Sequence, residues 1–137
     1  MWSHLLAAAA LLGPTQAIVA SPSIARVEIT AGAKEDEAFA RCRGDAAQAF
    51  GGRFEVEPHA AVSPVDPDHI VAAWAVRSAS LGVIQTAASF DGGKSWTPPR
   101  TLPFNACAGG PVEAALRSSD PWVAIGPEGR VYVSAIA

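Results

Sequence analysis

The chain has 137 residues, a formal net charge of −3 and 17% charged residues, which permits one small domain with a modest core. The mild acidity and the absence of a lysine or arginine cluster argue against nucleic acid or an anionic membrane surface as a partner. No uninterrupted apolar run reaches the roughly 18 residues that a membrane-spanning helix needs. We therefore expect no membrane span.

Residues 1–20 predict an export signal. An apolar core from Leu5 to Leu12 is broken by Gly13-Pro14, and small residues follow, with cleavage expected after Ala17 or Ala20. The first four residues carry no lysine or arginine, although such signals usually begin with positive charge, so an apolar N-terminal tail is the alternative. The signal predicts a secreted or periplasmic protein.

Residues 21–53 predict a short strand followed by a polar segment. Ser21 to Thr30 ends in an alternating pattern that is typical of a strand. Small and polar residues follow, and they include one candidate short helix from Asp45 to Phe50 with Asp45 as its cap.

Two cysteines, Cys42 and Cys107, fit an oxidising compartment. A bridge between them would close a loop of about 64 residues and would stabilise the fold by roughly 4 kcal/mol in the chain-entropy model. Two separate buried thiols are the alternative. Neither cysteine has a second Cys or His at zinc-ligand spacing, and Gly109-Gly110 lacks the residues of a phosphate loop, so we expect no metal and no cofactor.

From Phe54 onward the pattern is that of β-strands. Four strands joined by short turns are predicted at Pro58 to Pro64, His69 to Arg77, Gly82 to Phe90 and Trp96 to Leu102. The last of them contains Pro98-Pro99 and belongs at a sheet edge, because proline donates no ladder hydrogen bond. Four antiparallel strands of this kind make one propeller blade, which we assign to residues 54–104.

The chain then repeats itself. Residues 57–64 align without a gap with residues 120–127, and residues 70–74 align with residues 131–135. Strand-based repeats of this length are typical of propeller blades. Residues 105–137 are thus a linker and the first half of a second blade. We expect a fragment of a larger protein, the alternative being a finished small β domain with an exposed edge.

The third and fourth strands flank the segment Ser89-Phe90-Asp91-Gly92-Gly93-Lys94-Ser95-Trp96. It resembles the Asp box, S-x-D-x-G-x-[ST]-W, of sialidases and other BNR-repeat β-propellers. Ser89 and Asp91 are expected to accept hydrogen bonds from the turn, Gly92 and Gly93 to supply positive φ angles, and Trp96 to anchor the turn in the apolar layer. The resemblance implies a structural hairpin on the face away from the active site.

Residues 54–137 as a whole resemble the opening blades of exported sialidase-like proteins. The resemblance implies a six- or seven-bladed propeller whose central pocket binds a glycan, and a glycoside hydrolase that acts on terminal sugars. The alternative is a non-catalytic propeller that binds glycan or protein. The Arg-Ile-Pro motif of the family is missing, no carboxylate lies between Arg77 and Gly82, and Tyr132 comes too early to be the nucleophile. No catalytic residue is therefore assigned.

Three charged residues are the candidates for the rim of such a pocket. The blade geometry implied by the resemblance places Glu57 and Asp120 at the starts of neighbouring inner strands and Arg77 on the adjoining loop. In the alternative reading, Glu57 and Asp120 cap turns and Arg77 is a solvated loop residue. His59, which aligns with Trp122, is predicted to be a packing residue.

Overall fold

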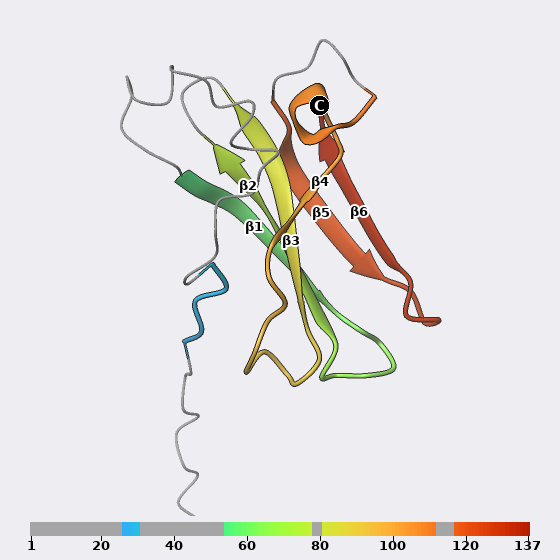
Figure 1. Ribbon diagram of the computed structural model, residues 1–137. Helices are drawn as coiled ribbons and strands as arrows, with labels where there is room; N and C mark the ends of the chain where they lie inside the picture. The colour runs from blue at the N-terminus through green and yellow to red at the C-terminus, as the bar shows by residue number, and fades with distance from the viewer. Residues whose placement is uncertain (1–25, 31–53, 78–80, 112–116) are drawn as a thin grey trace, which may run out of the picture.

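The computed structural model describes residues 26–30, 54–77, 81–111 and 117–137. These residues form two antiparallel β-sheets and one 3-10 turn, so the prediction of an all-β fold is confirmed. The elements are β1 (Phe54–Val62), β2 (Ile70–Arg77), β3 (Gly82–Ser89), β4 (Arg100–Leu102), η2 (Ala106–Ala108), β5 (Ser119–Ile125) and β6 (Val131–Ile136). The two sheets do not close into a ring (Figure 1).

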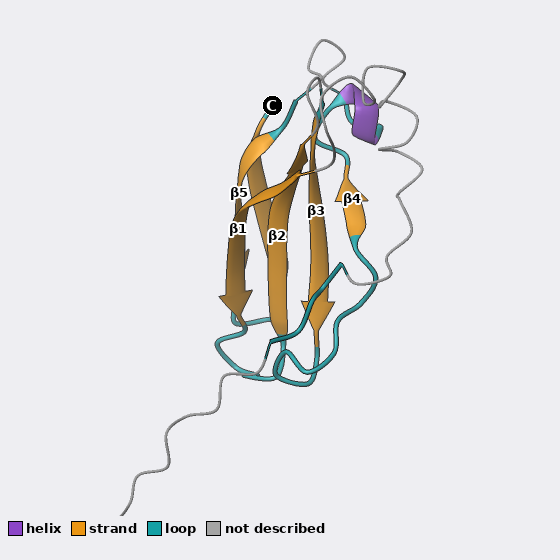
Figure 2. Cartoon of the chain, turned by 90° about the vertical axis from the view of Figure 1, so that its left-hand side faces the viewer, coloured by secondary structure: helices purple, strands orange, loops and turns teal. Residues whose placement is uncertain are grey.

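The first sheet is a meander in which each strand pairs with the next one along the chain, in the order β1-β2-β3-β4 (Figure 2). The central pair is regular over its whole length, from Ile70 opposite Ser89 to Arg77 opposite Gly82. β2 and β3 are rich in Val, Ile and Ala and are largely buried on both faces. The sheet is therefore the framework on which the other segments pack.

Most strand boundaries lie within two residues of the predicted ones, and three differences are larger. β1 starts at Phe54, four residues before the predicted start at Pro58, because the strand continues through a bulge. β4 covers only Arg100–Leu102, since Pro98 and Pro99 just before it cannot donate ladder hydrogen bonds.

The third difference concerns the predicted strand from Ser21 to Thr30. In its described part, residues 26–30, the chain is irregular and ends in a turn. Alternation alone is not sufficient, because a strand also needs a partner edge to pair with. The candidate helix at Asp45 to Phe50 lies outside the described residues.

The second sheet packs against one face of the first. β5 and β6 form a hairpin, and β5 lies against β1 and β2 (Figure 1). Val123 of β5 is 1% exposed and belongs to a buried cluster with residues of β2 and β3. The other buried members of this cluster are Val71, Ala73, Ala75 and Ile84.

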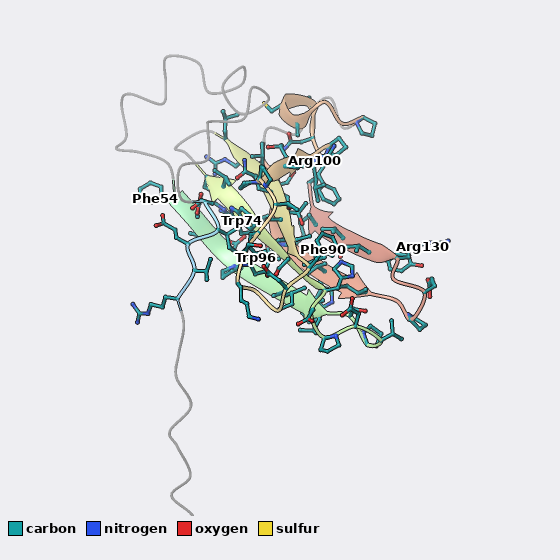
Figure 3. The ribbon with its side chains drawn as sticks, turned by 60° about the horizontal axis from the view of Figure 1, so that its bottom comes forward. Phe54, Trp74, Phe90, Trp96, Arg100 and Arg130 are labelled. Carbon is teal, nitrogen blue, oxygen red and sulfur yellow. The ribbon has the colours of Figure 1, made fainter. Side chains whose placement is uncertain are left out.

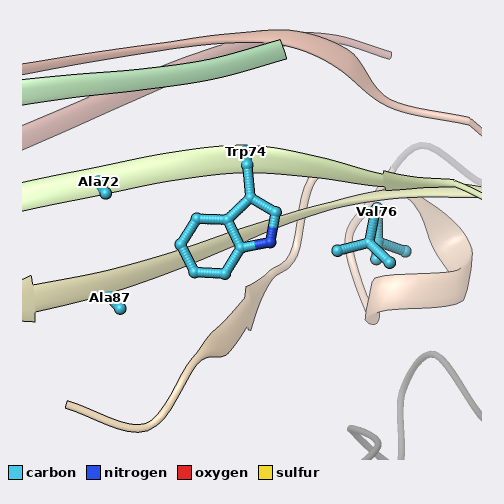
Figure 4. Packing of buried hydrophobic residues seen from close by; sticks show 5 residues of the cluster. Ala72, Trp74, Val76 and Ala87 are labelled. Atoms are coloured by element: carbon cyan, nitrogen blue, oxygen red, sulfur yellow. The ribbon is translucent and has the colours of Figure 1, made fainter. Parts of the chain in front are cut away.

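The opposite face of the first sheet holds a second apolar cluster, which surrounds Trp74 (Figure 4). Its buried members are Ala72, Trp74, Val76, Val83 and Ala87, and Ile29, Trp96 and Ala108 pack against them. The Nε1 atom of Trp74 is buried without a hydrogen-bond partner among the described residues. Trp96 thus contributes to the same apolar layer as Trp74.

The sequence repeat is also a repeat of backbone geometry. Glu57 and Asp120, 63 positions apart, are the two non-glycine residues with positive φ in the described chain, at 57° and 51°. Each precedes a proline, and in each case the register of strand pairing shifts at the same place, so both strands carry a bulge. Positive φ is unusual for a non-glycine residue, and a following proline disfavours helical conformations. The two units therefore share a specific, strained turn.

Among the described residues there is no helix of the length and apolarity that crossing a lipid bilayer requires.

Candidate functional site

The hairpin Ser89–Trp96 between β3 and β4, which we call the Asp-box hairpin after the motif that its sequence resembles, is closed by its own side chains. The Ser89 hydroxyl is buried, donates to Asp91 Oδ1 at 2.8 Å, and accepts the N–H groups of Gly93 at 2.8 Å and Asp91 at 3.3 Å. Asp91 accepts the Ser95 N–H at 2.9 Å on Oδ1 and the Ser95 hydroxyl at 2.5 Å on Oδ2. Each short polar side chain of the motif thus replaces water around a turn amide.

The glycines and the tryptophan complete the hairpin. Gly92 and Gly93 have φ angles of 70° and 87°, which glycine adopts without a steric penalty. The Gly92 N–H donates to the Asp68 carbonyl at 3.0 Å, which ties the hairpin to the turn between β1 and β2. The indole N–H of Trp96 donates to the Gly93 carbonyl at 3.1 Å, so the ring is fixed at its polar end.

Hydrogen bonding lowers the pKa of Asp91. The hydroxyl of Ser95 contributes most, followed by the Ser95 N–H and the Ser89 hydroxyl, and together they lower the pKa to about 2. These donors stabilise the ionised form, so Asp91 is a carboxylate at any pH near neutrality. Since both of its oxygens accept hydrogen bonds within the hairpin, Asp91 is suited to holding the turn and not to acid–base chemistry.

The hairpin and the rim candidates lie at opposite ends of the first sheet. Phe90 belongs to the hairpin, and Phe54 marks the other end, where β1 begins and β2 finishes; Figure 3 shows the two apart, with Trp74 between them. Glu57 and Arg77 belong to the Phe54 end. The hairpin and the rim candidates therefore do not form one site.

The structure brings the three rim candidates together. Arg77 Nη2 lies 2.8 Å from Glu57 Oε1, in an ion pair whose side chains are 36% and 35% exposed. The other oxygen of Glu57 accepts the backbone N–H of Asp120 at 2.9 Å. Asp120 is exposed, and its Oδ2 accepts the Ser119 hydroxyl at 2.7 Å. We call Glu57, Arg77 and Asp120 the rim cluster.

The bulge in β1 explains why Glu57 can reach both partners. A bulge adds a residue to one strand and turns a side chain away from the usual alternation. Glu57 sits in the bulge with its left-handed φ, between the end of β2 and the start of β5. Its carboxylate thus joins the two repeats, since it accepts the N–H of Asp120 in the neighbouring repeat. Arg77 is ion-paired and also partly exposed.

A second residue of β1, His59, also joins the repeats. His59 Nδ1 accepts the N–H of Val123 at 3.2 Å, and its ring lies 4.0 Å from the Trp122 ring, tilted by 33°. His59 is a packing residue, as predicted, but its hydrogen bond to Val123 was not expected. The two partners are 64 positions apart, so only the repeat alignment hinted that they could meet.

Asn105 fixes the segment that leads into β5 through hydrogen bonds of its side chain. Its side chain is fully buried, and its Nδ2 donates to the Gly82 carbonyl and to the Ser118 hydroxyl, both at 2.8 Å. Its Oδ1 accepts the N–H of Ala108 at 3.1 Å. The sequence analysis missed this residue because an isolated asparagine in a loop has no distinguishing pattern.

Cys107 lies in the same region, is 7% exposed, and takes part in a disulfide bond. Cys42, with which it was predicted to pair, lies outside the described residues. The described part of the chain contains no group of three or more Cys, His, Asp or Glu residues that could hold a metal ion.

Comparisons of the chain with protein-family models, with curated proteins and with solved structures give no match.

Proposed function

We propose that this chain is part of an exported, sialidase-like Asp-box β-propeller that acts on the terminal sugars of glycans, with the rim cluster as its glycan-facing end. One observation carries the proposal. The same strained turn occurs at the start of two successive inner strands, and the Glu57 carboxylate accepts both the Arg77 guanidinium of its own repeat and the backbone N–H of Asp120 in the next, at the end opposite the Asp-box hairpin.

The chemistry of the rim cluster suits a sugar. Glycans present hydroxyl groups that both donate and accept hydrogen bonds, and hydrogen bonds to charged partners are stronger than those between neutral groups. Asp120 is an exposed carboxylate and Arg77 a partly exposed guanidinium. Strained residues are also more frequent at functional sites than elsewhere, which adds support to the assignment.

A second candidate is a non-catalytic propeller that binds glycan or protein at the same end. The observation that favours it is the ion pair between Arg77 and Glu57, because this arginine already has a carboxylate partner. A sialidase grips the carboxylate of its substrate with arginines, which need free N–H groups for that purpose.

Hydrolysis and binding assays on the native, secreted protein separate these candidates. Turnover of a fluorogenic sialoside or other terminal glycoside would support the hydrolase, whereas glycan binding without turnover would support the binding propeller. Residues 1–137 alone are expected to be inactive in either case, because they contain one tyrosine and it lies on β6, away from the rim cluster. A native protein that neither binds nor cleaves any glycan would contradict the proposal.

A further inference from the structure

The internal repeat relates each face of the first sheet to a face of the second. The face of the first sheet that the second sheet covers includes Val71 and Ala73. The positions aligned with them are Tyr132 and Ser134, which are exposed on the outer side of the β5–β6 hairpin. We call the residues of that side the outer β5–β6 face: Trp122, Ala124, Tyr132, Ser134 and Ile136. A surface that is covered in the first repeat is thus uncovered, among the described residues, in the second.

The inner side of the same hairpin also has a counterpart. Val123 and Val133 pack on the buried cluster of the first sheet, and the positions aligned with them are Ala60 and Ala72. Ala72 belongs to the cluster around Trp74, and Ala60 lies directly opposite Ala72 in the pairing of β1 with β2, so the two share a face. We call this side the Trp74 face: Pro58, Ala60, Val62, Ala72 and Trp74. It corresponds to the hairpin side that already takes part in sheet packing.

The Trp74 face is apolar and partly open. Val62 is 54% exposed, and Pro58 and Ala60 are also exposed. A hollow of about 310 Å³ lies on this face, and its lining includes Pro58, Ala72 and Trp74. Sheets bury their apolar faces against another element, so this hollow offers room for a further apolar surface.

The aligned side chains of the two faces differ in size in a complementary way. Val133, on the inner side of the hairpin, is matched by the smaller Ala72 on the Trp74 face. Val71, on the covered face of the first sheet, is matched by the larger Tyr132 on the outer β5–β6 face. One face therefore loses volume where the other gains it, and the hollow beside Ala72 and Trp74 provides space for a large side chain. Since protein interiors are closely packed, the two changes together favour a fit between the faces.

From these two faces we propose that the chain associates head to tail, with the outer β5–β6 face of one copy packed on the Trp74 face of the next. This contact repeats between copies the sheet packing that each copy already contains. A second copy is the occupant because every copy carries one face of each kind, and repeat units bury their faces against neighbours of the same kind. The contact joins two different surfaces, so the assembly grows into a ring or an open chain. The inference does not depend on the proposed glycan function.

Trp122 adds a specific contact to this arrangement. Within one copy, the His59 ring lies 4.0 Å from the Trp122 ring, yet Trp122 is still 62% exposed. His59 and Trp122 are aligned positions of the repeat. The same packing between copies therefore predicts that the exposed side of the Trp122 ring contacts His59 of the next copy.

Two variants, each altered on one face, test the proposal when they are mixed. Tyr132→Lys with Ile136→Lys places charges on the outer β5–β6 face, and Ala60→Lys with Val62→Lys places them on the Trp74 face. Burial of an unpaired charge is costly, so each variant should sediment as a monomer at concentrations at which the unmodified chain associates. An equimolar mixture should sediment at twice the monomer mass and no further, because one intact face of each kind remains to form a single contact.

Val65→Lys with Phe90→Lys is the matched control. It adds the same two positive charges at exposed apolar positions outside the strands, which belong to neither face. This control should associate like the unmodified chain. All of these chains share residues 1–53, so a difference between them reports on the changed face.

Three results would overturn the proposal. The first is an unmodified chain that stays monomeric up to about 1 mM, a concentration that populates complexes with a Kd of that order. The second is self-association of the variant altered on the Trp74 face, because outer faces would then pack on one another. The third is a mixture of the two variants that stays monomeric.

Circular dichroism shows whether each variant is folded. If a lysine pair unfolds the chain, the shorter polar replacements Ala60→Ser with Val62→Thr and Tyr132→Thr with Ile136→Thr take its place in the same mixing experiment. Serine and threonine keep the side chains near their original size, so these variants test the same two faces with the same expected outcomes.

Discussion

Two carboxylates of this chain, Asp91 and Glu57, show how the surroundings of an acidic residue fix its role. Asp91 accepts hydrogen bonds only from the turn that contains it, at separations of two and four residues. Glu57 instead contacts groups 20 and 63 residues away. Asp91 therefore organises local structure, whereas Glu57 connects parts of the chain that only folding brings together.

The lowered pKa of Asp91 predicts a specific dependence of stability on pH. The value falls from 3.8, its reference for an unperturbed aspartate, to about 2 in the folded chain. A carboxyl group with a lowered pKa contributes stability above the unfolded pKa, and this contribution is lost as the pH falls through the folded pKa. Asp91→Asn should therefore melt at a lower temperature than the unmodified chain at pH 7, and the difference should shrink between about pH 4 and pH 2.

Thermal melting followed by circular dichroism at pH 7, 4 and 2.5 tests this prediction. Ser95→Thr retains a hydroxyl that can donate to Asp91, so it should resemble the unmodified chain at each pH. A melting difference for Asp91→Asn that stays constant from pH 7 to pH 2.5 would contradict the assignment of the carboxylate as the stabilising group.

At the scale of elements, local patterns predicted most of what was found, and contacts between distant segments were the main omission. The Asp-box turn follows from adjacent residues whose chemistry suits a tight hairpin, and β2 and β3 follow from continuous apolar runs. β4 is shorter than predicted because two prolines act against the strand pattern, and residues 26–30 are irregular because alternation does not supply a partner strand.

The rim cluster was predicted only as a set of candidates, for a related reason. The repeat alignment identified Glu57 and Asp120 as equivalent positions, but equivalence does not show that the side chain of one bonds the backbone of the other. That contact depends on the bulges and on how β5 packs against β1. Asn105 was missed altogether, since its partners Gly82 and Ser118 adjoin it only after both sheets have formed.

Asn105→Ala should destabilise the junction between the two sheets. The substitution removes the partner of the buried Ser118 hydroxyl, whereas the Gly82 carbonyl still accepts the Ser118 N–H and the Ala108 N–H still donates to the carbonyl of residue 105. An unsatisfied buried polar group costs about 1–3 kcal/mol, so we expect the free energy of unfolding to fall by about that much. Urea denaturation measures this change. Arg130→Ala, in the exposed turn before β6, is the control, and a loss as small as that of the control would show that Asn105 is dispensable.

At the scale of the whole molecule, the repeat indicates how each sheet face is used. On β2, Val71, Ala73 and Ala75 are at most 4% exposed because the second sheet packs on them. The aligned positions of β6 are Tyr132, Ser134 and Ile136, which lie on the outer face of the second sheet. The face of β2 is thus covered by the second sheet, whereas no described residue covers the aligned face of β6.

This difference predicts that the outer face of the β5–β6 hairpin makes the chain prone to self-association. Trp122, Tyr132 and Ile136 are 62%, 50% and 64% exposed there, although the Trp122 ring also contacts the His59 ring and the Tyr132 hydroxyl donates to Glu128. Large exposed apolar patches bind apolar dyes and promote association. The unmodified chain should bind such a dye and sediment as increasingly large species as its concentration rises.

Replacing the three exposed side chains with polar residues isolates the cause. Trp122→Ser, Tyr132→Thr and Ile136→Thr together should reduce dye binding and association while the first sheet stays folded, because Val123 and the buried cluster lie on the other face. Val65→Ser, at an exposed turn residue of the first sheet, removes apolar surface elsewhere and should have little effect. If the triple variant associates as strongly as the unmodified chain, then this face does not cause the association. The alignment of β6 with β2 would then not predict which surface is available for packing.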